Sequence, residues 1–430
     1  YDKQIKFILF LKEIIPSHLA KQVRDTVFLI PDLKERNKFL SLQVEKYEQG
    51  YEGKLFNKEN VSSKKYNEVY SLKEFFLPFP RLDTRLGWQA TENSRRAHYL
   101  EIVDQYVFAI SGLGESIYFD LSNLETKKLN QKKIKNNINI LLKDMNAELI
   151  GIRDLYYDNG NLYISLQHKD KNGYTIGVYR APLNLKNLEF ENFFSIKEYW
   201  DEYNVFSGGR LEKFLDDNIL FTIGFSYQFD KSQKKDSFLG KIISIDKETK
   251  EYELISYGHR NPQGLFFNQD FRIIMNTEHG PKGGDEVNFN YLDENRLTNF
   301  GWPISSHGEP YPGEKARFKK NGWMQTSHKD NGFAEPIKHF TPSIGISELF
   351  FLKNENNKNP NHLFVSSLRA SSIYILTLDK TLKKVIDEDR IYFPNKRIRD
   401  LKYDKKNNQF LFLSEYTPSI GVLKKIKKIN

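Results

Sequence analysis

One pattern of hydrophobic and polar positions recurs along most of the chain. An apolar strand is followed by a turn that contains Asp, Asn or Gly, and a second apolar strand then closes on Ser or Thr. Alternating apolar positions on both sides of turn residues are typical of a β-hairpin. Six copies can be read, and they begin at Ala97, Gly151, Gly209, Gln263, Ser347 and Arg397.

The spacing of these copies indicates the architecture. They start about 50 to 60 residues apart, except for one interval of about 84, and a spacing near 50 suits a four-stranded propeller blade. The long interval holds a Gly- and Pro-rich insertion, Phe300 to Phe333. A hairpin cannot bury both faces alone, so stacking in a ring would supply the core and leave few free edges. We therefore predict an all-β fold, a six-bladed β-propeller, over residues 93–430; a β-sandwich would not give six such hairpins.

The first 92 residues lack this pattern. Asp32, followed by Leu33 to Gln49 and then Gly50, predicts a capped helix with a glycine stop, so residues 1 to about 50 are expected to be helical. Residues 51–92 are polar and mixed, and we expect an irregular arm. The apolar run Ile5 to Ile15 is shorter than the about 20 residues that cross a bilayer. It predicts an amphipathic helix packed on the main body or, alternatively, the end of a membrane anchor.

Composition supports a large β domain and excludes some functions. The chain has 33 Phe and 24 Tyr, and aromatic side chains fit pleated, half-buried surfaces. The net charge of +9 arises from 65 Lys and Arg against 56 Asp and Glu scattered along the chain. This distribution is typical of a solvated surface, so we expect no nucleic-acid partner. The absence of Cys excludes disulfides, thiolate metal sites and thiol catalysis.

Three stretches carry more chemistry than the rest of the repeats. The first, Tyr257 to Leu265, is dense in polar groups at the start of a strand, where propeller loops line the central channel. The second, Thr277 to Glu286, has glycines that leave backbone carbonyls exposed, as a hard cation such as Ca²⁺ requires. In the third, Lys396 to Asp400, alternation places Arg397 and Arg399 on one side, where they could hold a polyanion.

At these residues the sequence resembles a known family. GHRNPQGL, TEHGPKGGDE and FGWP, in this order and spacing, are similar to the glucose/sorbosone dehydrogenases, propellers that use the quinone cofactor PQQ. The resemblance covers roughly Glu148 to Tyr416. It implies a PQQ- and Ca²⁺-dependent oxidation of aldose sugars. The residues that it implies are Arg260 and Asn261 at the quinone, Gly280 and Pro281 as carbonyl ligands of Ca²⁺, and Arg397, Arg399 and Arg369 (where the family usually has Lys) at the PQQ carboxylates.

The sequence departs from this family where the base should be. The resemblance implies a His four residues before Arg210, which would take the proton of the sugar's anomeric hydroxyl, and Phe206 stands there. Val205 replaces an acidic neighbour, and Leu149 replaces an expected Gln. Phenylalanine cannot accept a proton, and loss of a general base typically costs about 10²- to 10⁴-fold in rate. We therefore leave the catalytic base unassigned and expect weakened or lost catalysis.

Each of these residues also has a purely structural interpretation. His259 and His279 could be histidines at blade junctions, and Trp302 could plug a rigid turn. Arg397 and Arg399 could serve only to bridge neighbouring blades, since alternating charges on a strand are often paired across it. These interpretations remain open at this point.

Several functions therefore compete. One is a PQQ-dependent sugar dehydrogenase in which another group replaces the base. The alternative is a non-catalytic binding or assembly propeller with a sugar or other small ligand in the central channel and protein partners on its rim. A lactonase-type propeller would need more acidic or amide side chains at the channel than the sequence offers. The absence of Cys by itself fits either a reducing cytosol or a Cys-sparing exported protein. Together with the habit of export that the resemblance implies, it leads us to expect the periplasm or cell envelope, with membrane association through the N-terminal segment.

Overall fold

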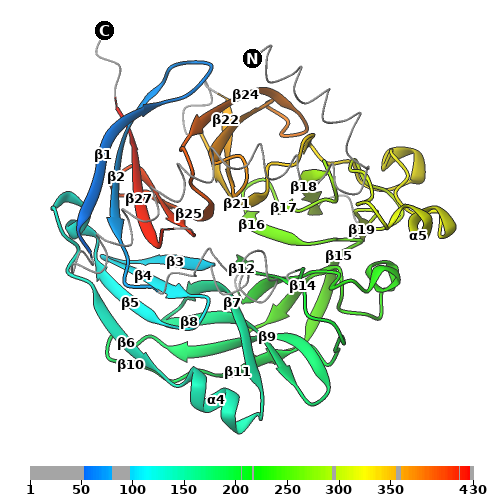
Figure 1. Ribbon diagram of the computed structural model, residues 1–430, viewed down its shortest axis with the longest axis horizontal. Helices are drawn as coiled ribbons and strands as arrows, with labels where there is room; N and C mark the ends of the chain where they lie inside the picture. Colours follow the sequence, from blue (N-terminus) through cyan, green and yellow to red (C-terminus); the bar gives the residue numbers. More distant parts are fainter. Residues whose placement is uncertain are drawn as a thin grey trace, which may run out of the picture. The chain divides into compact units, whose positions relative to one another are not determined.

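The computed structural model describes residues 53–79, 97–204, 206–215, 217–292, 297–354, 360–415 and 417–426. The strands of this part of the chain form six sheets around a central axis (Figure 1). The innermost strand of each sheet contacts the innermost strands of its two neighbours, and these contacts close a ring. The predicted six-bladed β-propeller is thereby confirmed.

Each blade is an antiparallel sheet whose strands follow one another from the axis outward, with short parallel additions at two outer edges. The first blade contains β3 (His98–Val103), β4 (Tyr106–Ser111), β5 (Ser116–Asp120), β6 (Lys132–Asn136) and β10 (Asn187–Leu188). The second contains β7 (Glu148–Asp158), β8 (Asn161–Asp170), β9 (Gly173–Pro182) and β11 (Glu191–Ser195). The third contains β12 (Gly208–Phe214), β13 (Asn218–Ile223), β14 (Lys241–Asp246), β15 (Tyr252–Tyr257) and β19 (Thr298–Asn299).

The fourth and fifth blades follow the same plan, and the sixth is completed at its outer edge by the first two strands of the described chain. The fourth contains β16 (Pro262–Asn268), β17 (Ile273–Glu278), β18 (Asp285–Tyr291) and β20 (Lys338–Phe340). The fifth contains β21 (Ile346–Leu352), β22 (Asn361–Ser367), β23 (Ser372–Leu378) and β24 (Val385–Tyr392). The sixth contains β25 (Ile398–Asp404), β26 (Gln409–Ser414), β27 (Ser419–Lys425), β2 (Val69–Phe76) and β1 (Leu55–Ser62).

Helices within the described ranges are short and lie in connections. They are the α-helices α4 (Ile138–Asp144) and α5 (Lys315–Lys320) and the 3₁₀ helices η2 (Leu121–Glu125), η3 (Phe229–Gln233) and η5 (Lys329–Asn331). A helix with the length and apolar character needed to span a bilayer does not occur in these ranges. The helix expected at Leu33 to Gln49 and the apolar run Ile5 to Ile15 lie outside the described residues.

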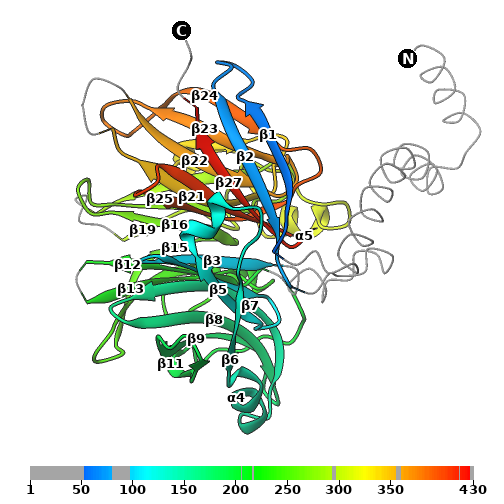
Figure 2. The ribbon, with the colours of Figure 1, turned by 90° about the vertical axis from the view of Figure 1, so that its left-hand side faces the viewer.

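The sixth blade corrects our expectation of an irregular arm at residues 51–92. Strands β1 and β2 form a hairpin, and β2 pairs with β27 from Tyr70↔Lys425 to Phe76↔Ser419. Figure 2 shows this blue hairpin beside the red C-terminal strand. The propeller therefore begins near residue 53 rather than 93, and strands from distant parts of the sequence complete one blade. This pairing covers the edge that β27 would otherwise expose.

The hydrophobic core lies between adjacent blades rather than within one layer. Each apolar cluster joins residues of two neighbouring blades; Ile152 and Phe108, for example, pack together between the first and second blades. Corresponding clusters fill the other five junctions. This distribution follows from the hairpin repeat, because each sheet has two apolar faces and finds a partner on both sides.

Near the axis the inner strands carry charge instead. Arg210 of β12 is buried, and its Nη1 donates hydrogen bonds to Asp154 of β7 and Asp400 of β25, each at 2.9 Å. The same atom lies 3.0 Å from Oε2 of Glu348 in β21. One guanidinium therefore holds the inner strands of four blades together. Buried charges of this kind are tolerated only when they are paired.

Candidate functional site

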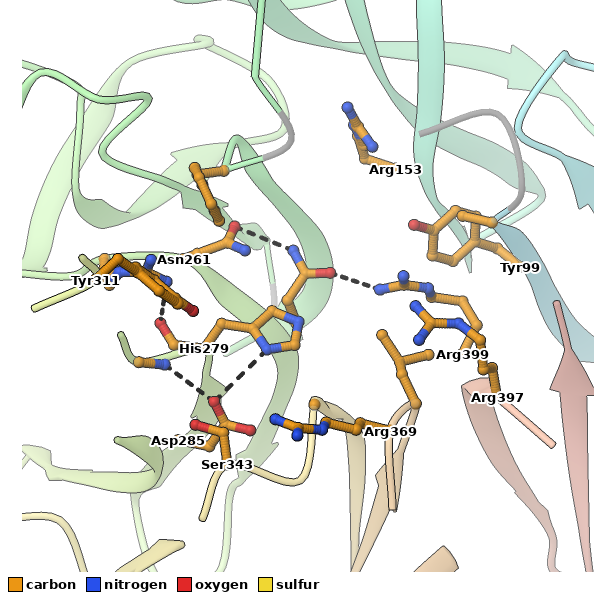
Figure 3. Close-up of a pocket in the computed structure, with 17 residues that line it drawn as sticks. Tyr99, Arg153, Asn261, His279, Asp285, Tyr311, Ser343, Arg369, Arg397 and Arg399 are labelled. Atoms are coloured by element: carbon orange, nitrogen blue, oxygen red, sulfur yellow. Dashed lines mark hydrogen bonds and ion pairs between the residues drawn. The ribbon is translucent and has the colours of Figure 1, made fainter. Parts of the chain in front are cut away.

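A cavity of about 270 Å³ is lined by residues from all six blades (Figure 3). Its volume is near the lower end of the range of small-molecule sites, about 300–1,000 Å³. We call it the arginine cavity, because five arginines line it. Its lining residues are Ala97, Tyr99, Arg153, Phe206, Arg260, Asn261, Gln263, His279, Gly280, Asp285, Tyr311, Ser343, Gly345, Leu368, Arg369, Arg397 and Arg399.

The structure brings nearly all of the site residues predicted from sequence into this cavity. They are Arg260, Asn261, Arg369, Arg397, Arg399, Gly280 and the base position Phe206. Pro281 instead lines a smaller neighbouring cavity. In Figure 3, Arg397 and Arg399 lie on one side of the arginine cavity, and Asn261, His279 and Tyr311 lie on the other. The roles that the resemblance implies for these residues remain predictions.

Arg260 follows β15 in a loop that is held by the fourth blade. Its backbone N–H donates to Oε1 of Glu278, and its Nη1 donates to the carbonyl of His279 at 2.9 Å. Its Nε is buried and has no hydrogen-bond partner within the described part of the chain. Burial lowers the pKa of the guanidinium. An unpaired buried donor is costly, so this atom favours a ligand that supplies an acceptor.

Arg397 and Arg399 share one carboxylate, Glu415, which follows β26. Nε of Arg397 donates to Oε2 at 2.8 Å, and Nε of Arg399 donates to Oε1 at 2.6 Å. Burial alone would raise the pKa of Glu415, but Arg399 and Arg397 hold it at about 2. The two arginines thus face the same side, as alternation predicted. The structural alternative placed these arginines as a bridge between neighbouring blades, whereas Glu415 belongs to the same sixth blade, so the shared carboxylate braces that blade instead.

Charge on the cavity wall is strongly unbalanced. Nη1 of Arg399 donates to Oε1 of Gln263 at 2.7 Å, which keeps the guanidinium at the wall. The exposed side chain of Arg369 makes no hydrogen bond or ion pair with any residue that the structure describes. Five arginines line the cavity against a single carboxylate, Asp285. Even with Glu415 counted, the balance remains positive by about three charges, which suits a polyanion.

His279 and His259 differ in position. His279 lines the cavity, and its Nδ1 lies 3.8 Å from Oδ1 of Asp285. Burial would raise the pKa of Asp285, but the nearby His279 lowers it. His259 is completely buried, with Nδ1 3.0 Å from Glu278 and Nε2 2.8 Å from Oγ of Ser256. The structural interpretation is therefore confirmed for His259, whereas His279 faces the site.

At the base position, the ring of Phe206 lies among aromatic side chains. Its centroid is 5.6 Å from that of Phe225 and 5.0 Å from that of Tyr227. Trp302 is buried in the neighbouring apolar cluster, which confirms its interpretation as packing. Leu149 packs against the core between the first two blades and does not line the cavity, and Val205 lies outside the described residues.

Arg153 was not predicted. It lies in β7, is buried, and donates from Nε to Oε1 of Gln167 at 3.0 Å. Strict alternation would place Arg153 opposite Asp154, and irregular pairing between Ile152 and Asp154 disturbs that alternation. The loop residue Tyr311 was also missed, since nothing in the Gly- and Pro-rich insertion indicated that it reaches the cavity.

The carbonyls expected to bind Ca²⁺ can be tested on the structure. The carbonyl of Pro281 accepts hydrogen bonds from Oγ of Ser343 at 3.2 Å and from the N–H of Gly284 at 3.3 Å. Its lone pairs are therefore already engaged. Gly280 lines the arginine cavity. The two carbonyls are therefore not both free to bind Ca²⁺. The residues of this site fit a polyanion better than they fit Ca²⁺.

Comparison with known proteins agrees with this geometry. Residues 129–420 match the family model Glucose / Sorbosone dehydrogenase. The aldose sugar dehydrogenase YliI of Escherichia coli is 25% identical over 284 residues, covering 62% of this chain and 72% of that protein. Among solved structures, a glucose dehydrogenase superposes with a TM-score of 0.62 at 20% identity, over 78% of this chain and 98% of its own.

A further solved structure holds the cofactor itself. The PQQ-bound form of the aldose sugar dehydrogenase from Streptomyces coelicolor has a TM-score of 0.53 at 16% identity, over 76% of this chain and 98% of its own. At such identities the structural matches establish the fold alone. The family model, by contrast, covers more than half of the sequence, including every residue that lines the arginine cavity except Ala97 and Tyr99. This chain belongs to the glucose/sorbosone dehydrogenase family.

Proposed function

We propose that the arginine cavity binds pyrroloquinoline quinone or a closely similar aromatic polycarboxylate. The observation that carries this proposal is the convergence of five arginines, two of them from the sixth blade, on one cavity with a single lining carboxylate. Arg369 has no partner among the described residues, and Nε of Arg260 is buried and unpaired. A planar ligand with three carboxylates would satisfy both and would match the charge of the wall.

Four of the five arginines have identifiable parts in this arrangement. Arg397 and Arg399, braced by Glu415, present a fixed pair of guanidinium groups to the carboxylates. Arg369 adds an exposed cation at the mouth of the cavity. The rings of Phe206 and Trp302 pack against the guanidinium of Arg260 and exclude water from it. The lower local dielectric strengthens the interaction of Arg260 with an anion. Ca²⁺ at Gly280 and Pro281 stays a prediction, and binding of the polycarboxylate does not depend on it.

We propose further that sugar oxidation is weakened or lost. When bound, PQQ supplies a hydride acceptor, but the alcohol proton must also be removed, and Phe206 offers no lone pair for it. Among the lining residues, His279 and Asp285 can accept protons, but their side chains pair with each other at 3.8 Å. A propeller that binds its ligand without oxidising sugars is therefore the second candidate function, and Phe206 is the observation that favours it.

The test titrates the full chain with PQQ, first with added Ca²⁺ and then with EDTA, and follows tryptophan fluorescence and cofactor absorbance. We expect saturable binding of one equivalent. Arg399→Gln and Arg369→Gln should each weaken binding at least about tenfold, since a charge-assisted hydrogen bond contributes about 1.5–3 kcal/mol. Arg180→Gln is the matched control, because Arg180 pairs with Glu191 on the outer strands of the second blade and does not line the arginine cavity. Absence of binding under both conditions, or equal loss in the control, would refute the proposal.

Location and partners are also proposed. A periplasmic or envelope location follows from the lack of Cys together with the habit of the family. Fractionation of native cells tests it, and recovery of the chain in the cytosol would contradict it. The partners that we propose are a sugar or other small ligand above the bound quinone, a protein on the propeller rim, and a membrane contacted through the N-terminal segment.

A further inference from the structure

A second group of chemically active side chains lies outside the arginine cavity. Glu286 of β18, His307 and His328 each offer one ligand atom, and these atoms all lie within 4.8 Å of one another. Glu286 and His328 are buried, and His307 is half-buried. None of the three lines the arginine cavity. We call this group the His–Glu cluster.

The orientation of His328 suits metal ligation. Its Nδ1 lies 2.7 Å from Oγ of Ser305, and its Nε2 lies 3.1 Å from Oε1 of Glu286. If Nδ1–H donates to the serine, the Nε2 lone pair faces a carboxylate oxygen, and two acceptors at this distance are held together by either a proton or a metal ion between them. An outer hydrogen bond that fixes the ring in this way is typical of metal-binding histidines.

A simple hydrogen bond between His328 and Glu286 would satisfy those two groups, but it does not account for His307. The ring centroid of His307 lies 5.0 Å from that of His328, and the ring stacks on His339 at 4.3 Å. Its Nε2 lies 3.2 Å from Oε2 of Glu335, a second carboxylate of the kind that orients ligating imidazoles. Three of the chain's nine histidines thus gather beside two carboxylates.

The ligand types indicate the class of ion. Two imidazoles and one carboxylate are typical of Zn²⁺ and similar first-row transition metals, whereas Ca²⁺ and Mg²⁺ take oxygen ligands. Three protein ligands leave one position of a tetrahedral ion for water or for a further carboxylate. We propose that Glu286, His307 and His328 bind a divalent transition-metal ion of the zinc class.

The position of this site gives the ion a structural consequence. His307 and His328 lie near the two ends of the insertion Phe300 to Phe333, while Glu286 belongs to the fourth blade. The same insertion contributes Tyr311 to the wall of the arginine cavity. A bound ion would therefore attach the insertion to the blade and fix one wall of the neighbouring cavity. The site itself requires neither PQQ nor catalysis.

The experiment uses the full chain without an affinity tag and with the metal alone as probe. After EDTA treatment and dialysis, Zn²⁺ binding is measured by equilibrium dialysis with elemental analysis, in the presence of a 100-fold excess of Ca²⁺. We expect one equivalent of Zn²⁺ per chain. His307→Asn and the nearly isosteric Glu286→Gln should each weaken binding at least tenfold. His362→Gln is the control, because His362 lies in β22 of the fifth blade and should leave binding unchanged.

Two further readouts keep the result decisive if a variant is unstable. Co²⁺ should give the intense visible absorption of a tetrahedral site in the wild type and not in Glu286→Gln. Zn²⁺ should raise the thermal midpoint of the wild type and of His362→Gln but not of His307→Asn. The proposal is overturned if the wild type binds no Zn²⁺, if excess Ca²⁺ displaces it, or if both cluster variants bind as tightly as the control.

Discussion

The guanidinium carbon of Arg260 lies 4.7 Å from the centre of the Phe206 ring, so an aromatic side chain covers a cation at the position where a base was expected. Such a contact is attractive, because the face of the ring carries partial negative charge. The side chains around Phe206 therefore stabilise an apolar ring at this position. The rings of Phe225 and Trp302 flank the same guanidinium at 5.5 and 5.3 Å.

This relationship predicts the effect of restoring a base. With PQQ and Ca²⁺ supplied, the wild type should show aldose oxidation near background, and Phe206→His should raise it by about 10²-fold or more. The adjacent Arg260 would disfavour a protonated imidazole and so keep the new base neutral near pH 7. Dye-linked turnover is the measurement, and Phe206→Asn, polar but not basic, is the control. Robust oxidation by the wild type would show that another residue acts as base.

A second prediction concerns the charged contacts at the axis. Arg210→Gln would leave Asp154, Glu348 and Asp400 without their shared cation, and removing one partner of a buried ion pair costs about 3–5 kcal/mol. Thermal midpoints at one fixed scan rate should therefore fall steeply. Arg180→Gln removes an exposed pair, which is worth about 0–1 kcal/mol, and should change the midpoint little. Equal midpoints for the two variants would contradict this account of the axis.

The sequence predicted the blades because each hairpin is local. Alternation and turn residues within about 20 positions define such a unit. It missed the hairpin of β1 and β2, since β1 is mostly polar and the partner of Tyr70 is Lys425 at the other end of the chain. No short window of sequence contains that pairing.

Most residues of the arginine cavity were also predicted from sequence, because they too lie in short, local motifs. Arg260, Asn261, Arg397 and Arg399 lie in contiguous motifs, and the structure brings them together. Arg153 was missed because irregular strand pairing overrides simple alternation. The His–Glu cluster was missed because its members come from three separate segments, and only the fold of the insertion brings them close.

The hairpin that completes the sixth blade gives a third prediction. Leu72 of β2 is buried, and Leu72→Ala should destabilise the propeller by about 2–5 kcal/mol. Ser71→Ala on the opposite face of the same strand should change stability by less than about 0.5 kcal/mol. Limited proteolysis would report release of the hairpin. A Leu72→Ala protein as resistant as the wild type would mean that β2 does not contribute to closure.

The last prediction follows from the pKa of Glu212 in β12. Burial raises it to about 8, and the nearby carboxylates Glu101, Glu348 and Asp154 act in the same direction, while Lys402 opposes them. In the unfolded chain the group titrates near 4.3. Between these values the folded protein binds more protons than the unfolded chain, so this group makes stability fall as pH rises from about 5 to 8.

Glu212→Gln removes this titration, so its thermal midpoint should depend less on pH over that interval than the midpoint of the wild type. Near pH 5 the two proteins should be similar, because the wild-type carboxyl is then mostly protonated when folded. Near pH 8 the variant should be the more stable, because the wild type must keep a carboxylate beside other carboxylates. Glu251→Gln on the outer surface serves as control, and parallel pH profiles for the wild type and Glu212→Gln would contradict the prediction.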